Sequence, residues 1–184
     1  MGAFRLVASG VNVSGVVQEL EAHPDLWNAR AYRTESVASP HHGIPDIWLR
    51  YRKLSELTSP QAYREEHFAE FYDEWNLVPS LHPIVYGLMA AVKAVYLGGI
   101  IVTRIPPGHQ VKPHDDRGSW HAERMNTKAY LILKDNPWCL NHCDGDTVHM
   151  RTGDVWEFDN LRPHSVVNDG PSDRWTAIIS MRCE

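Results

Sequence analysis

Residues 100–116 read IIVTRIPPGHQVKPHDD, two runs of β-forming residues on either side of the turn at residues 106–108. Aliphatic and β-branched residues bounded by Pro and Gly are typical of short strands. Similar runs follow closely up to the C-terminus, and the strands predicted in this half are 100–105, 125–133, 138–142, 147–150, 154–158, 164–168 and 175–181. Many short strands separated by turns predict a β-sandwich or a small barrel.

The second run carries His114 and Asp116, two residues apart. If residues 111–116 are extended, side chains two apart point to the same face, so His114 and Asp116 can bind one ion while Asp115 points away. His164 begins a later predicted strand and is the third candidate ligand. Two imidazoles and one carboxylate that leave the opposite positions of the ion open are typical of non-haem iron(II) oxygenases.

Residues 1–99 have a different pattern, in which helical periodicity alternates with short extended runs. In the strand predicted at 46–52, period two places Ile47, Leu49 and Tyr51 on one face. Ser80 is expected to begin the best helix, which Gly98-Gly99 would end. The remaining predictions are a helix at 16–22 capped by Asn12 or Ser14, a strand at 27–34, a loop at 39–45 and a helix at 60–75.

Composition limits the chain to one hydrophobic core. With 184 residues, 43% of them hydrophobic, we expect a single domain, 1–184, in which a support region, 1–99, packs against a β core, 100–184. A net charge of -5 without Lys/Arg runs argues against nucleic acid and membrane partners and favours small molecules. Three cysteines, no long apolar run and no signal-peptide pattern predict a cytoplasmic protein.

Several of these motifs together resemble the aspartyl/asparaginyl β-hydroxylase family of iron(II)- and 2-oxoglutarate-dependent oxygenases. The resemblance covers about residues 100–182 and implies a double-stranded β-helix, the jelly-roll or cupin-like barrel. The motifs that carry it are Pro106-Pro107-Gly108, His114-x-Asp116, the segment GDVWEFD at 153–159, His164, Asn168 and Arg174.

The resemblance also implies roles for individual residues. His114, Asp116 and His164 would bind iron(II) as the catalytic centre, and Arg174 would hold the distal carboxylate of 2-oxoglutarate. Thr103 falls where the family has a hydroxyl near that carboxylate. Asn126 and Lys128 stand where the family has an Arg-x-His pair for the other end of the cosubstrate, so these contacts differ here and Lys128 is expected to act as a single-point donor. Turnover would consume O2 and release succinate and CO2.

Because Asp116 completes the triad, the chain resembles bacterial members that hydroxylate free amino acids, and a free amino acid or small derivative is the first choice of substrate. An Asp/Asn or other side chain in a peptide or protein is the second. Candidate substrate-binding residues are Trp48 and Arg50 on the predicted strand, His41 and His42 in the loop before it, and Arg117 and Trp120, with His121 and Arg124, after the ligands. An exposed edge strand and a solvated loop would give the same patterns.

Three rival interpretations remain open. Arg174 is also consistent with an ordinary surface arginine at a strand end. Cys139, His142 and Cys143 have a spacing that can bind zinc, but no second pair follows, so buried thiols and an exposed histidine are favoured. A barrel of this type can also be a metal-binding protein that senses a ligand without oxygen chemistry.

Overall fold

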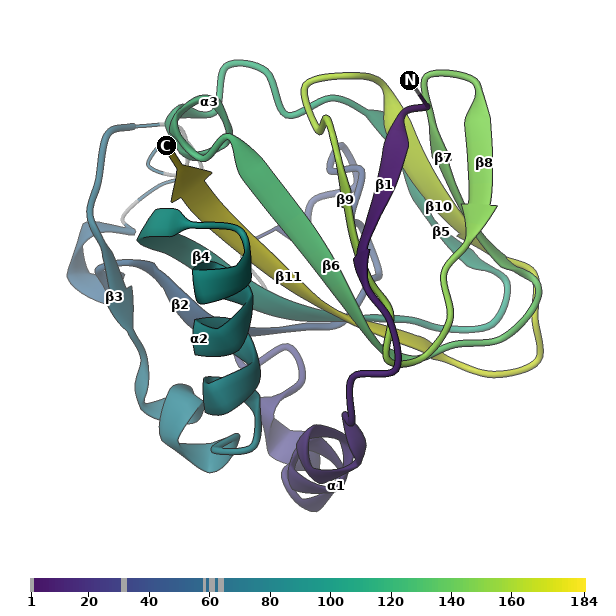
Figure 1. The fold of residues 1–184 in the computed structure, drawn as a ribbon, viewed down its shortest axis with the longest axis horizontal. Coiled ribbons are helices and arrows are strands. Elements are labelled where there is room, and N and C mark those ends of the chain that lie inside the picture. Colours follow the sequence, from purple (N-terminus) through teal and green to yellow (C-terminus); the bar gives the residue numbers. More distant parts are fainter. Residues whose placement is uncertain (1, 31–32, 58, 60–61, 63–64) are drawn as a thin grey trace.

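The computed structural model describes residues 2–30, 33–57, 59, 62 and 65–184. Two antiparallel sheets form the core (Figure 1), one with the strand order β1-β9-β6-β11-β4-β2-β3 and the other with the order β5-β10-β7-β8. The strands are β1 Phe4–Ala8, β2 Asp46–Arg52, β3 Ala69–Phe71, β4 Ala94–Ile105, β5 His109–His114, β6 Thr127–Lys134, β7 Cys139–Cys143, β8 Asp146–His149, β9 Val155–Phe158, β10 His164–Asn168 and β11 Arg174–Cys183. This is the predicted jelly roll.

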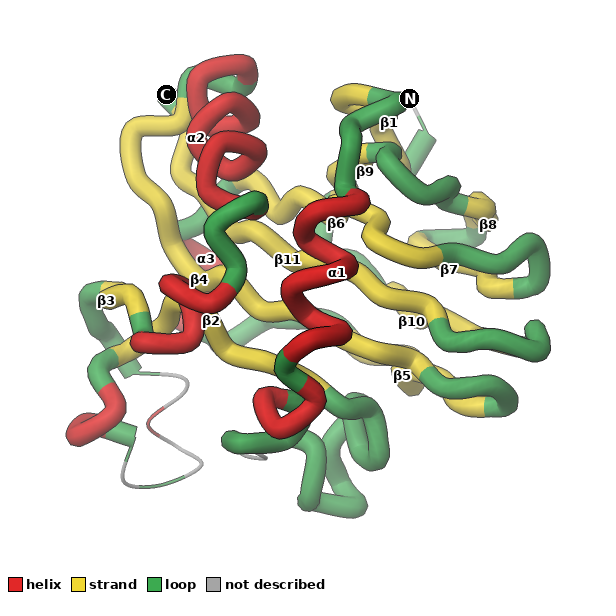
Figure 2. Tube along the Cα trace, turned by 90° about the horizontal axis from the view of Figure 1, so that it is seen from below, coloured by secondary structure: helices red, strands yellow, loops and turns green. Residues whose placement is uncertain are grey.

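Two helices cover the face of the seven-stranded sheet that is turned away from the four-stranded sheet (Figure 2). They are α1, Ser14–Ala22, and α2, Leu81–Ala91; the short α3, Trp120–Arg124, lies after the candidate ligands. The 3-10 segments within the described ranges are η1 Pro24–Leu26, η2 Leu54–Glu56 and η4 Asp73–Leu77. No helix among the described residues is long and apolar enough to cross a membrane.

Side-chain alternation along the central strands separates two hydrophobic layers. On β6, Leu131 and Leu133 pack into the cluster that contains the apolar residues of both long helices. Tyr130 and Ile132 point the other way and pack with residues of the second sheet. Burial on both faces explains why these strands read as nearly continuous apolar runs, and the inner layer positions the candidate site.

The N-terminal predictions were less accurate. The strand expected at 27–34 is a series of turns in its described residues, and 31–32 lie outside them. The helix expected at 60–75 is wrong where the structure describes it, because residues 69–71 form β3 and a 3-10 segment follows. Phe68 is exposed, so the apparent helical period did not report a buried stripe.

The predicted boundaries of the two long helices were partly correct. The Ser14 backbone N–H donates to Asn12 Oδ1 at 3.1 Å, so Asn12 assists the start of α1. Helix α2 does begin after Ser80, but the Ser80 hydroxyl donates to Glu19 rather than capping the helix. The prediction that Gly98-Gly99 ends this helix was wrong. The helix stops at Ala91, and both glycines lie inside β4.

The two glycines have a packing role instead. A Cβ on Gly98 would lie 2.8 Å from His121 Cε1, and one on Gly99 would lie 2.9 Å from Tyr51 Cδ2. The Gly99 N–H also donates to His121 Nε2 at 3.0 Å. The absent side chains therefore allow an imidazole and a phenol ring to lie directly on the strand.

Strand β2 has the predicted bounds but not the predicted faces. Its register against β4 shifts between Trp48 and Arg50, which pair with Ile101 and Ile100. The extra residue moves Tyr51 to the face of Trp48, where the two rings meet edge to face with centroids 4.9 Å apart. A β-bulge, which the alternating sequence does not reveal, thus turns Tyr51 toward the candidate site.

Candidate metal centre

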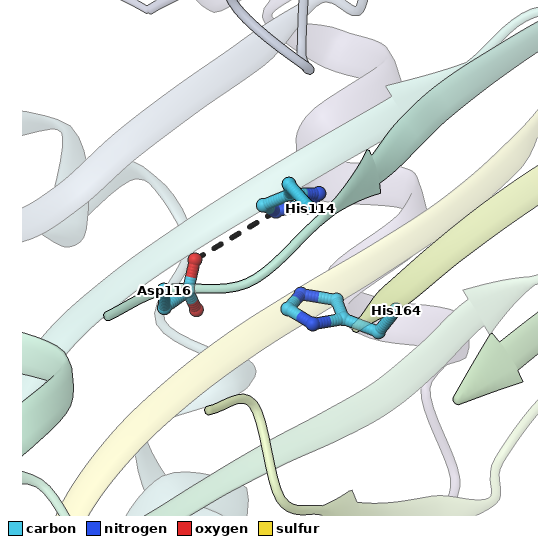
Figure 3. Close-up of side chains that lie close together, drawn as sticks. All are labelled: His114, Asp116 and His164. Atoms are coloured by element: carbon cyan, nitrogen blue, oxygen red, sulfur yellow. Dashed lines mark ion pairs between the residues drawn. The ribbon is translucent and has the colours of Figure 1, made fainter. Parts of the chain in front are cut away.

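Three side chains converge at one end of the four-stranded sheet (Figure 3). His114 ends β5, His164 begins β10, and the two residues are register partners. Asp116 lies two residues beyond the end of β5. One ligand atom from each of the three residues lies within 4.8 Å of the others, and among the described residues they form the one such group of three or more.

Backbone carbonyls orient both imidazoles. Nδ1 of His114 bonds the Lys112 carbonyl at 2.8 Å, and Nδ1 of His164 bonds the Arg162 carbonyl at 2.9 Å. Each Nδ1 must therefore carry the proton, which leaves a lone pair on Nε2. Both Nε2 atoms are buried and have no hydrogen-bond partner in the described part of the chain. The arrangement suits a metal ligand at each Nε2.

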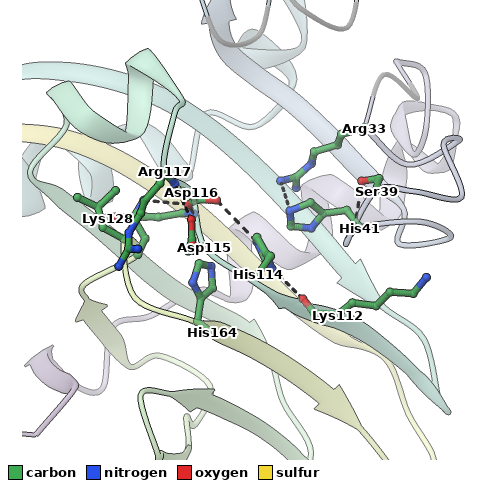
Figure 4. Close-up of polar contacts among 12 residues, drawn as sticks. Arg33, Ser39, His41, Lys112, His114, Asp115, Asp116, Arg117, Lys128 and His164 are labelled. Carbon is green, nitrogen blue, oxygen red and sulfur yellow. Dashed lines mark hydrogen bonds and ion pairs between the residues drawn. The ribbon is translucent and has the colours of Figure 1, made fainter.

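Asp116 is positioned by the loop rather than by strand alternation. Its N–H donates to the Asn160 carbonyl at 3.0 Å, and its Oδ2 accepts from Lys128 Nζ at 2.6 Å and from Asn160 Nδ2 at 2.8 Å. Oδ1 lies 3.7 Å from His114 Nε2. As expected, Asp115 points away: it is exposed, and its Oδ1 accepts from the Arg117 N–H at 3.1 Å (Figure 4).

Electrostatics favour the protonation states that a divalent cation requires. Burial alone would raise the pKa of Asp116, but the Lys128 ammonium and the hydrogen bonds from Lys128 and Asn160 hold this pKa well below its usual value. Burial, together with the Lys128 charge, lowers the pKa of His164 to about 4. Burial also lowers the pKa of His114. An ionised carboxylate and two neutral imidazoles are ready to bind metal without losing protons.

Arg174 lies inside the barrel, not on the surface. Its side chain is fully enclosed at 1% exposure, and the residue sits opposite Ile105 on β4. Nη1 lies 3.7 Å from Cys139 Sγ and Nη2 lies 3.8 Å from Met150 Sδ. Nε has no partner among the described residues. Sulfur is a weak acceptor, so this buried cation lacks the anion that such groups require.

The surroundings of Arg174 fit a carboxylate of 2-oxoglutarate. Thr103 and His164 line the same cavity, so the structure brings the predicted hydroxyl, the arginine and one metal ligand together. The cavity is narrow, about 20 Å³, and a five-carbon diacid needs its lining side chains to move apart. The guanidinium that meets only sulfur is the observation that favours an anionic ligand here.

Asn126 and Lys128, the two predicted contacts of the other carboxylate, lie in different places. Lys128 is beside the triad, paired with Asp116. Asn126 is exposed, and its side chain exchanges hydrogen bonds of 2.8 and 2.9 Å with the backbone of Cys183. Asn126 therefore connects the start of β6 to the end of β11.

Five predicted substrate residues lie outside the cavity next to Asp116. Its lining residues are Arg33, Tyr51, Gly99, Ile101, Asp116, Ser119, His121, Ala122, Met125, Lys128, Asn160, Ile178 and Ser180. Arg50 donates to the Leu97 carbonyl and lies over the Phe71 ring at 4.4 Å. Trp48 is buried behind Tyr51, Trp120 packs on His67 with centroids 5.1 Å apart, and His42 and Arg117 are exposed.

Sequence reasoning missed several residues that line the cavities beside the triad. Arg33, Tyr130 and Asn160 line the two cavities, and none belongs to a recognisable motif. His41, named only as a loop candidate, lies with its ring 5.0 Å from that of His114. Burial, then the Arg33 charge, lowers the pKa of His41 well below its ordinary value, so this ring is neutral.

The rival zinc site does not assemble. Cys139 and Cys143 are free, buried thiols on one face of β7, as the alternation predicted. His142 points elsewhere, and its Nδ1 pairs with Thr147 Oγ1 at 2.9 Å. The sequence prediction of buried thiols is confirmed, whereas the histidine predicted to be exposed is half-buried.

Comparisons with known proteins agree with this geometry. The sequence profile described as Aspartyl/Asparaginyl beta-hydroxylase matches residues 66–182, well over half of the chain. No curated protein has a significantly similar sequence.

Solved structures show the same fold at low identity. A prolyl-4-hydroxylase from Pseudomonas putida has a TM-score of 0.57 and 16% identity over 99% of this chain and 93% of that chain. A Trichoplax adhaerens prolyl hydroxylase, in complex with a hypoxia inducible factor oxygen degradation domain peptide fragment, has a TM-score of 0.59 and 12% identity over 98% and 83%. A Burkholderia pseudomallei oxidoreductase of the 2OG-Fe(II) oxygenase family has a TM-score of 0.55 and 11% identity over 77% and 67%.

Proposed function

The chain belongs to the aspartyl/asparaginyl β-hydroxylase family, and from that premise we propose that it hydroxylates a carbon of a free amino acid or small amino-acid derivative. As a member of this family it is an iron(II)- and 2-oxoglutarate-dependent dioxygenase. This family assignment argues against the alternative of a ligand-sensing barrel without oxygen chemistry. We also propose that residues 1–184 act as one domain, because β1, β2 and β3 share a sheet with β4, β6, β9 and β11.

In this proposal the iron ligands are His114, Asp116 and His164, and three protein ligands leave positions open for other groups. Iron(II) with 2-oxoglutarate and O2 supplies the oxidising chemistry: the cosubstrate becomes succinate and CO2, and one oxygen atom enters the substrate. Lys128 and Asn160 hold the carboxylate of Asp116 ionised and oriented. The residues of this chain thus prepare the centre before any ligand enters.

The cosubstrate would be anchored by Arg174, with Thr103 beside it. The single observation that carries this assignment is the buried guanidinium, whose hydrogen-bond partners among the described residues are both sulfur atoms and which lines the same cavity as His164. A carboxylate would give it the charge-assisted hydrogen bonds that the protein itself does not provide.

The small size of the cavity beside Asp116, about 120 Å³, supports a small substrate. Pockets for drug-sized ligands measure about 300–1,000 Å³. Succinate release, measured against a panel of free amino acids, tests the proposal, because a correct substrate raises the rate of 2-oxoglutarate consumption. If none of them stimulates turnover, a free amino acid is the wrong substrate class.

A peptide or protein side chain is the second candidate. It is favoured by the Trichoplax adhaerens enzyme of the same fold, whose structure contains a peptide fragment. The same assay with a peptide library, followed by mass spectrometry for a gain of one oxygen atom, decides between the two.

A further inference from the structure

A second arginine, Arg33, borders the candidate metal ligands from a different cavity than Arg174. The cavity beside Asp116 is lined by Lys128 and Asn160 near the triad and by Tyr51, His121 and Arg33 further out. Figure 4 shows Arg33 reaching from its loop toward His41, which lies beside His114. A group bound at Arg33 would therefore share one small cavity with a metal ligand.

Arg33 is held in place by only part of its guanidinium. Nε donates to Asp46 Oδ2 at 2.7 Å, and Asp46 is completely buried at the start of β2. Nη1 lies 3.5 Å from His41 Nε2. Nη2 is buried and has no hydrogen-bond partner among the residues that the structure describes. The ion pair thus fixes the side chain and leaves a charged donor unused.

The neighbouring Arg30 shows what a purely structural arginine looks like here. Both arginines have 20% exposed side chains, and each pairs with a buried or half-buried carboxylate. Arg30 pairs with Glu74 and lies over the Tyr72 ring at 5.0 Å, and its nitrogens are not among the buried unpaired atoms. Arg33 differs because it lines a cavity and also has a buried nitrogen without a partner among the described residues.

Lys128 does not compete for an anion in this cavity. Its ammonium already donates to Asp116 at 2.6 Å. Lys128 is held against a candidate metal ligand, whereas Arg33 is the lining cation with a buried nitrogen that has no partner within the described chain. A buried donor left unsatisfied is destabilising, more so when it is charged, and a carboxylate removes that cost.

We propose that Arg33 binds the carboxylate of the substrate, so that the ligand of this cavity is a small monocarboxylate, with its remaining atoms directed toward Asp116. This inference rests on the proposed function, because it supplies the anchor for a free amino acid. A residue within a peptide chain has no free α-carboxylate for this contact. The structure thereby replaces Arg50, the sequence-based candidate, whose guanidinium is turned to Leu97 and Phe71.

The test compares amino acids with their α-amides, which keep the side chain and lose the charge. Calorimetry under anaerobic conditions, with zinc(II) as a redox-inert ion and 2-oxoglutarate present, measures binding directly. We expect the wild-type protein to bind the preferred amino acid at least ~10-fold more tightly than its amide, a difference of about 1.4 kcal/mol. Arg33→Gln should bind both equally, with the amide affinity unchanged.

Arg30→Gln is the matched control and should keep the wild-type ratio of the two affinities. Because Arg33→Gln leaves Asp46 buried without its cation, the double variant Arg33→Gln/Asp46→Asn provides a version in which both charges are removed. Circular dichroism and unchanged zinc affinity establish that each variant is folded. Persistence of the carboxylate preference in folded Arg33 variants would overturn the proposal.

The outcomes separate this inference from the proposed function. Amino acids that bind through Arg33 but do not stimulate succinate release would leave the anchor standing and remove the proposed substrate class. Amino acids that stimulate turnover equally in wild-type protein and Arg33→Gln would keep the function and remove the anchor. No binding of any amino acid, nor of acetate or propionate as simple probes, at millimolar concentration would remove the anchor.

Discussion

Arg174 and Arg33 line two cavities that each contain one of the candidate metal ligands, but their charges have different surroundings. Arg174 is carried by a central strand and meets only the sulfur atoms of Cys139 and Met150. Arg33 is carried by a loop and is balanced by the buried carboxylate of Asp46. Within the described ranges the first arginine has no counter-ion, whereas the second has one and also has a buried nitrogen without a partner. A buried cation near a site can therefore either lack a counter-ion or be neutralised by a buried carboxylate of the same protein.

The largest expected effect is on iron affinity and comes from removing Asp116, a candidate ligand of the metal centre. Asp116→Ala deletes a ligand and leaves Lys128 unpaired, so iron affinity should fall by more than the ~10–100-fold that loss of an outer partner costs. Asp115→Ala, one residue away and exposed, should bind iron as the wild-type protein does. Anaerobic iron titration measures both. Equal loss in the two variants would mean that Asp116 is not a ligand.

The two arginines should then respond in opposite ways to neutral replacement. Arg174→Met removes a buried charge that has no anionic partner, so the melting temperature of the ligand-free protein should rise. Arg33→Met strands Asp46, so the melting temperature should fall. Thermal unfolding followed by circular dichroism measures both shifts. A lower melting temperature for Arg174→Met would show that its charge is already compensated.

Arg174→Met should also weaken 2-oxoglutarate binding while iron stays bound. Truncating one partner of a buried, hydrogen-bonded charge pair costs about 2–5 kcal/mol, or roughly 30- to 5,000-fold in affinity. Calorimetry with the zinc(II) form measures the loss. Cosubstrate affinity within a factor of two of wild type would place the carboxylate elsewhere.

A smaller effect is expected at Lys128, whose ammonium pairs with Asp116. Lys128→Met removes the ammonium that fixes Asp116 Oδ2, and metal affinity should fall about 10–100-fold. Lys134→Met is the control: its pair with Glu21 is on the surface, where such pairs contribute about 0–1 kcal/mol. If the two variants bind metal alike, the Lys128 contact does not orient the ligand.

The smallest effect concerns pH. Burial and the nearby His67 lower the pKa of His121 to about 3 from the ordinary 6.5. As pH falls below 6.5, His121 binds a proton in the unfolded chain but stays neutral in the folded protein. The contribution of His121 to the free energy of unfolding is therefore complete above about pH 6.5 and is lost toward pH 3. Between pH 7 and 5 the loss should be on the order of 2 kcal/mol. Denaturant titrations of His121→Gln at both pH values should show a shallower dependence.

The contrast between the arginines also explains what the sequence could reveal. The strands from residue 100 onward were predicted because turns punctuate them, and the positions of Arg174 and Thr103 follow from this regular framework. Their burial and proximity are consequences of register, since Thr103 pairs with Thr176 and Arg174 with Ile105. A residue on a strand can be located from its neighbours along the chain.

Arg33 could not be found in this way. The segment before β2 is irregular, and the position of the side chain depends on Asp46, thirteen residues later, and on His41. Asn160 likewise reaches Asp116 through contacts between two loops. The erroneous helix across 60–75 has the same origin, because apolar spacing alone does not reveal which residues are buried. Long-range polar contacts carry no local periodicity.

The bulge in β2 reverses the alternation of side chains between the two faces of this strand. Before Leu49, every second residue faces the helices; after Arg50, the alternation starts again with the opposite phase. One residue of chain length therefore determines whether a tyrosine or an arginine borders the cavity at Asp116. If the strand kept Leu49 but alternated regularly, Arg50 would lie on the face of Trp48 and Tyr51 would turn to the opposite face; the bulge takes up the additional residue and prevents this exchange.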